Sequence, residues 1–201
     1  MGIPLIPELT LRRTVLIIAI LNISYFLVEF LGALHLGSAS LLADSADFLE
    51  DASVNLLILL AMGWSAKRRA RIGMVMAGIL LLPALAFFWT VWQKAIDPVP
   101  PAGLGIMVVG LGALAVNLTC AFLIARHRND RGSLTKAAFL SARNDAAANV
   151  GIIGAGLLTM LYPSIWPDLI IGLAIAVMNL DAATVVWRAA RTEIRDIGPE
   201  G

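Results

Sequence analysis

Long apolar stretches make up most of this chain. Short polar connecting segments, called joints below, separate them. Six of the apolar stretches reach the roughly 20 residues that a helix needs to cross the hydrocarbon core of a bilayer. They cover residues 13–34, 38–64, 72–93, 102–125, 134–161 and 166–188. The pattern predicts an all-α membrane protein with six transmembrane helices.

The joints between these stretches are too short to form domains. Examples are "WSAKRRARIG" after the second stretch, "QKAIDPVPPAG" after the third and "RHRNDRGS" after the fourth. We therefore predict one transmembrane domain over residues 13–190. A cytoplasmic tail, 1–12, would precede it, and a short cytoplasmic tail, 191–201, would follow it without a C-terminal domain.

Basic residues predict the orientation of the helices. Of the 15 Lys and Arg residues, all but Lys94 and Arg143 fall in joints, in tails or at the ends of stretches, in places that six helices would put on one side. Cytoplasmic segments of membrane proteins carry such an excess. Both termini are expected in the cytoplasm, and the protein in the cell inner (cytoplasmic) membrane. Trp89, Trp92, Tyr162 and Trp166 would form the outer aromatic belt.

The high hydrophobic content of the chain supports a lipid environment, whereas its charge and cysteine content exclude few functions. Hydrophobic residues make up 59% of the chain, whereas soluble domains average about 45–50%. The net charge of +1 gives no indication of a nucleic-acid partner, and the single cysteine excludes an internal disulfide.

Acidic residues inside the apolar stretches are the unexpected feature. A charged side chain at the bilayer centre costs about 2.5–3.5 kcal/mol even on the mildest scale. Such groups must therefore pair, titrate or bind a cation. Apart from Asp168 at the start of the sixth stretch, they are Glu29, Asp44, Asp47, Glu50, Asp51, Asp145 and Asp181.

Spacing on the second stretch indicates a cation site. Asp47 and Asp51 are four residues apart, so they share one face of a helix. Two carboxylates this close repel each other in a low dielectric, and either a divalent cation or protons remove the repulsion. Asp44 lies on the same face, but we expect it to cap the helix or be solvated. Glu50 lies further round and is not expected to join the site.

The fifth stretch supplies a second cluster in "FLSARNDAAANVG". Asp145 would complete a site with Asp47 and Asp51. The fourth ligand would come from Ser141, Asn144, Asn149 or water, although interhelical hydrogen bonding is the alternative role for Ser141 and Asn149.

Two further polar groups inside the stretches have other roles in this interpretation. Glu29 and Asn22 on the first stretch are interpreted as partners in helix–helix hydrogen bonding, with proton relay as the alternative. Arg143 would snorkel or neutralise Glu50.

Three segments give the chain a resemblance to the cation diffusion facilitator family. They are "VEFLGALHLGSASLLADSADFLEDASVN", "AAFLSARNDAAANVGIIGAGLL" and "WPDLIIGLAIAVMNLDAATVVWRAA". The resemblance implies a proton-coupled exporter of divalent metal ions that works by alternating access. Carried over by position, its transport site is Asp47, Asp51, Ser141 and Asp145.

This chain departs from the family pattern at one position of the implied transport site. The family commonly has His where this chain has Ser141, so the site is richer in oxygen and harder, which favours manganese, cobalt or iron. Zinc is the commonest substrate of the family, and cadmium is another divalent transition-metal cation of the substrate class that the resemblance implies. No prosthetic group is implied, and a homodimer would depend on the membrane helices.

Two rival functions follow from the same sequence. A passive cation channel would conduct without proton coupling, and a non-transporting membrane subunit would transport nothing when purified alone. An enzyme is not expected, since the chain has no HExxH motif and only two His.

Overall fold

The computed structural model describes most of the chain as helix. The described residues are 11–61, 72, 74–75, 78–79, 81–125 and 132–179. Of residues 11, 58, 60, 61 and 132–143 only the backbone is described. Asp181 therefore lies outside the described residues, and so do the side chains of Ser141 and Arg143.

The helices follow the predicted stretches closely. Within the described residues there is no strand, so the predicted all-α class is confirmed. The helices are α1 (Leu11–Leu36), α2 (Ala39–Ala61), α4 (Leu81–Ile96), α5 (Gly103–Ala125), α6 (Gly132–Leu161) and a further helix, Trp166–Asn179.

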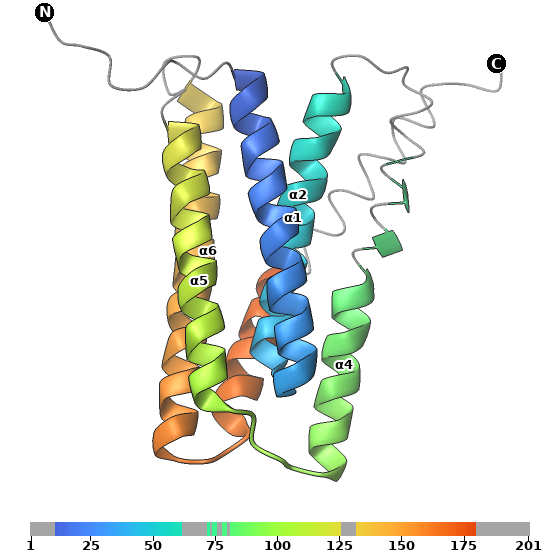
Figure 1. The fold of residues 1–201 in the computed structure, drawn as a ribbon, viewed down its shortest axis with the longest axis vertical. Helices are drawn as coiled ribbons and strands as arrows, with labels where there is room; N and C mark the ends of the chain where they lie inside the picture. Colours follow the sequence, from blue (N-terminus) through green and yellow to red (C-terminus); the bar gives the residue numbers. More distant parts are fainter. Residues whose placement is uncertain are drawn as a thin grey trace, which may run out of the picture.

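Helices that follow one another in the chain run in opposite directions and form a bundle (Figure 1). α1 packs against α2 and α5, and α5 packs against α6. The helix Trp166–Asn179 lies against α2 and α6: a Cβ at Gly172 would come within 2.8 Å of the Ala39 carbonyl carbon, and one at Gly151 within 3.4 Å of Ile171. The connections 37–38, 97–102 and 162–165 lie together at the lower end of the bundle in Figure 1.

A tight turn joins α1 to α2. Gly37 adopts a positive φ of 63°, a conformation that ends a helix at little cost only for glycine. The Ser38 amide then donates to the Ala33 carbonyl at 3.0 Å. Ser38 also caps α2, because its Oγ accepts from the Leu41 amide at 3.3 Å.

Asp168, near the start of helix Trp166–Asn179, fixes the beginning of α2. Its carboxylate accepts bonds from the Ser38 hydroxyl at 2.7 Å and the Ala39 amide at 2.8 Å. It also accepts from the hydroxyl and the amide of Ser40, at 2.7 and 3.1 Å. A carboxylate here satisfies amides that an α-helix leaves without partners.

Lys94 completes this network. Its Nζ lies 3.8 Å from Asp168 Oδ2 and donates to the Val99 carbonyl at 3.3 Å. The sequence placed Lys94 in a polar joint, but it lies in the last turn of α4 and is only 5% exposed. α2, α4 and helix Trp166–Asn179 are therefore tied together at one end of the bundle.

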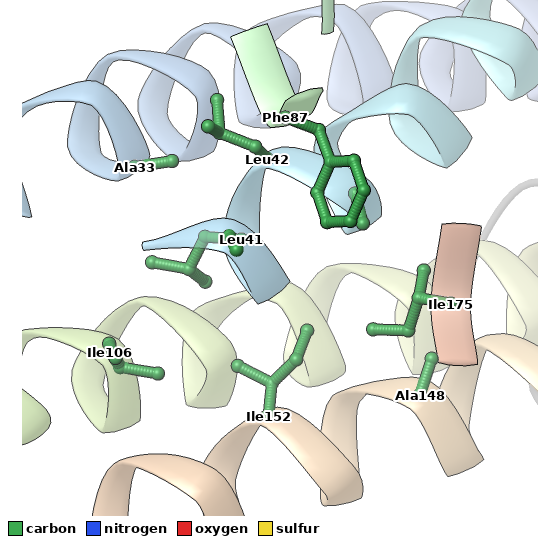
Figure 2. Close-up of a cluster of buried hydrophobic side chains, with 10 residues drawn as sticks. Ala33, Leu41, Leu42, Phe87, Ile106, Ala148, Ile152 and Ile175 are labelled. Carbon is green, nitrogen blue, oxygen red and sulfur yellow. The ribbon is translucent and has the colours of Figure 1, made fainter. Parts of the chain in front are cut away.

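A core of apolar side chains fills the space between the helices (Figure 2). It takes residues from every packed helix, which makes the bundle one unit. Its labelled members are Ala33, Leu41, Leu42, Phe87, Ile106, Ala148, Ile152 and Ile175. α5 and α6 approach closely at Gly156, where an added Cβ would lie 2.8 Å from the Gly103 carbonyl oxygen.

The outer surface of the bundle is apolar as well. Large hydrophobic side chains such as Leu85, Phe88, Val108 and Ile170 are between 59% and 66% exposed. An apolar surface of this extent is typical of a surface that contacts a membrane or another protein. Two helices, Arg12–Leu36 and Gly103–Ala125, are long and apolar enough to cross a membrane, and Leu81–Ile96 and Trp166–Asn179 are shorter apolar helices.

Candidate metal site

A polar cavity of about 200 Å³ lies between α2, α6 and helix Trp166–Asn179. It brings together three of the predicted carboxylates, from two helices that are far apart in the sequence. Its polar lining comes from the side chains of Asp47, Glu50, Asp51, Asn144, Asp145 and Asn179, and its apolar lining from Ala148, Ile175 and Met178.

Asp47 and Asp51 stand on successive turns of α2. Asp47 is eight positions after Ala39, the first residue of α2. At 1.5 Å per residue, Asp47 therefore lies about 12 Å along the helix from the end that Asp168 holds. Asn179 lines the cavity with Asp47, and its Nδ2 donates to the Ala43 carbonyl of α2 at 3.3 Å. The last described helix thus brings an amide to the same cavity.

α6 contributes Asp145 and Asn144 to the opposite wall. Asn149 does not line the cavity: it is fully buried, and its Nδ2 donates to the Asp145 carbonyl at 2.8 Å. Its Oδ1 has no hydrogen-bond partner among the described residues. The Ser141 side chain lies outside the described part, so its ligand role stays a prediction.

The structure adds two residues that sequence reasoning missed. Glu50 was expected to stay outside the site but lines the cavity. It is only about 60° from Asp47 around the helix, and its side chain is one methylene longer than that of aspartate. Asn179 comes from a helix with no predicted site residue. Its place in an apolar helix is the signal that could have found it.

Asp44 does not behave as the sequence suggested. It is 1% exposed, it lies inside α2 and not at its end, and neither of its oxygens caps an amide of the described chain. The expected capping or solvated role is therefore wrong. The reason is packing: α1 covers this face of α2, and Glu29 of α1 is Asp44's neighbour.

The cavity is lined by oxygen ligands and is larger than a bare cation. A volume of about 200 Å³ can hold several waters at about 30 Å³ each, so a cation could enter with part of its hydration shell. Among the described residues, no three side chains of the types His, Cys, Asp and Glu are gathered closely enough to hold a metal ion. The carboxylates face a common space and would have to draw together to coordinate an ion directly.

An apolar exterior and an acidic interior cavity are typical of helical membrane proteins, in which carboxylates inside the bundle are costly unless they serve a function.

Comparison with known proteins gives the family. Residues 15–194 match the cation efflux transmembrane domain, and the chain belongs to the cation efflux, or cation diffusion facilitator, family. The resemblance drawn from the sequence is thereby confirmed.

Curated relatives agree with this assignment. The chain is 26% identical over 191 residues to the zinc transporter ZitB of Pectobacterium atrosepticum, covering 89% of this chain. It is 22% identical over 183 residues to the cadmium, cobalt and zinc/H(+)-K(+) antiporter of Bacillus subtilis, covering 84% of this chain. Each alignment covers 58% of the relative's own length.

Proposed function

We propose that this chain is a proton-coupled efflux transporter for divalent transition-metal cations. It works by alternating access across the cytoplasmic membrane, with six transmembrane helices over residues 13–190 and both termini in the cytoplasm. The observation that carries the proposal is the cavity, where Asp47 and Asp51 of α2 face Asp145 of α6.

The transport step follows from the charges around the cavity. A divalent cation entering from the cytoplasm neutralises carboxylates that would otherwise repel each other in a medium of low dielectric. Protons from the outer side replace the cation and release it. Asp47, Asp51 and Asp145 are the proposed ligands, and Asn144, Ser141 or water completes the coordination.

The names of the relatives support a metal substrate. ZitB is named as a zinc transporter, and the Bacillus subtilis protein as an antiporter of cadmium, cobalt and zinc. The described lining of the cavity contains carboxylate and amide oxygens and no imidazole. Hard oxygen ligands suit manganese, iron or cobalt at least as well as zinc. We propose this group of cations as substrates, and a homodimer as the working unit.

Transport in reconstituted vesicles tests the proposal. The purified chain is placed in vesicles with a metal-sensitive dye and a pH-sensitive dye inside, and Zn²⁺, Co²⁺ or Mn²⁺ is added outside. We expect saturable metal uptake with opposite proton movement, and a loss of at least tenfold in the D51N variant. The D97N variant is the matched control, because Asp97 is an exposed carboxylate in the α4–α5 connection.

Three outcomes would overturn the proposal, each in its own way. Metal flux that does not saturate and moves no protons would indicate a passive channel. A folded chain without any flux would indicate a non-transporting subunit. Full flux in D51N would remove Asp51 from the site.

A further inference from the structure

A second pair of acids lies between α1 and α2, outside the metal cavity. Glu29 on α1 is 0% exposed and Asp44 on α2 is 1% exposed. Neither belongs to the lining of the cavity. The proposed transport step does not use them, although two buried acids side by side are costly to maintain.

The burial of this pair without hydrogen-bond partners points to a shared proton. The Glu29 and Asp44 side chains are neighbours across the contact between α1 and α2. None of their four oxygens has a hydrogen-bond partner among the described residues. A carboxylate can only accept, so one carboxyl can bond to another only if one of them carries a proton. A proton shared between the two carboxyls would give these buried oxygens the partner that they lack.

No basic side chain in the described part of the chain offers an alternative to that proton. Arg12, Arg13 and His35 are exposed, and Lys94 is paired with Asp168 at the end of the bundle. Without a proton the pair would place two negative charges together in the interior, which like-charge repulsion and burial both oppose.

The titratable groups around the pair are acids or neutral donors. Asp47 of α2 and Asp145 of α6 bring further negative charge near it. The neutral group is Tyr25 of α1, whose hydroxyl donates to the Val109 carbonyl at 2.5 Å. Negative neighbours keep the shared proton in place while the cavity holds no cation.

The pair is also placed to respond to the cavity. Asp44 is one helical turn from Asp47, a separation of about 5–6 Å between Cβ atoms. A divalent cation at Asp47 would put positive charge within that range in a medium of low dielectric. The positive field of the cation would oppose the negative field of the carboxylates that holds the proton, and would favour release of the proton from the pair.

We propose that Glu29 and Asp44 form a proton-binding site distinct from the metal ligands, an inference that rests on the proposed function. The O–H of one carboxyl is broken when a cation occupies the cavity, and the proton goes to water. After the cation leaves, the pair takes up a proton from water and the carboxyl–carboxylate hydrogen bond forms again. One positive charge thus moves opposite to each cation through residues that never touch the metal.

Counting protons released on metal binding tests the proposal. Calorimetric titration with Zn²⁺ or Co²⁺ in two buffers of different ionisation enthalpy gives both the affinity and the number of protons released. We expect the E29Q and D44N variants to bind metal while releasing about one proton fewer per cation than the wild type. The D97N variant, with its exposed carboxylate changed, should release the wild-type number.

Proton release that is unchanged in E29Q and D44N, with metal still bound, would overturn the proposal. If either single variant fails to fold, the double variant E29Q/D44N repeats the measurement, since its two amides can bond each other and carry no charge. Loss of metal binding in the wild type would instead reject the proposed function, so the two failures are distinguishable.

Discussion

Replacing Asp168 with alanine tests how the start of α2, the helix that carries Asp47 and Asp51, is held. The carboxylate accepts bonds from Ser38, Ala39 and Ser40 at 2.7–3.1 Å and lies 3.8 Å from Lys94 Nζ. The D168A variant removes all of these at once. It leaves two hydroxyls, two amides and one ammonium without their shared acceptor.

The cost can be worked from the contacts. Hydrogen bonds to a charged group contribute about 1.5–3 kcal/mol each, and removing one partner of a buried ion pair costs about 3–5 kcal/mol. Because these contacts share one carboxylate, they do not add in full. We expect D168A to lower the free energy of unfolding by about 3–5 kcal/mol.

Reversible unfolding in mixed detergent micelles, followed by tryptophan fluorescence, measures this change. The D97A variant serves as the control and should shift the free energy by less than about 0.5 kcal/mol, because Asp97 is exposed. The double variant D168A/K94M should recover part of the loss, since no buried ammonium remains unpaired. A loss below about 1 kcal/mol in D168A would refute the reasoning.

Three further predictions follow from the packing and from the cavity. The G156A variant should destabilise the fold by about 1–3 kcal/mol in the same unfolding assay, because its Cβ would lie 2.8 Å from the Gly103 oxygen, whereas G154A faces open space and should cost little. Metal affinity should fall as pH decreases, since protons compete for the carboxylates that bind the cation; calorimetry showing equal affinity at acid and neutral pH would contradict this. The E50Q variant should weaken metal binding by about three- to tenfold, as expected for a nearby charge worth about 1 kcal/mol, and an unchanged affinity would place Glu50 outside the site.

Periodicity was sufficient to predict the helices and part of the site. Apolar length located each described helix, and the four-residue spacing of Asp47 and Asp51 placed both on the face of α2 that lines the cavity. Asp145 followed from the cost of a carboxylate in an apolar helix. These inferences depend on local geometry, which a sequence contains directly.

Contacts between helices explain what could not be predicted. The spacing of Asp44 puts it on the same face as Asp47, and only the packing of α1 shows that Glu29 covers it. The sequence places Lys94 in a connection between helices, because its partner Asp168 lies 74 positions later in the chain and only the folded structure brings the two together. Asn179 joins the cavity because helix Trp166–Asn179 packs between α2 and α6.

An anomalous difference map from crystals grown with Co²⁺ tests the metal site most directly. We expect one strong peak inside the cavity, with oxygens of Asp47, Asp51 and Asp145 at coordinating distance and the Glu29–Asp44 pair free of metal. A map with its peak elsewhere, and with Asp47, Asp51 and Asp145 making no contact to it, would contradict the proposed transport site.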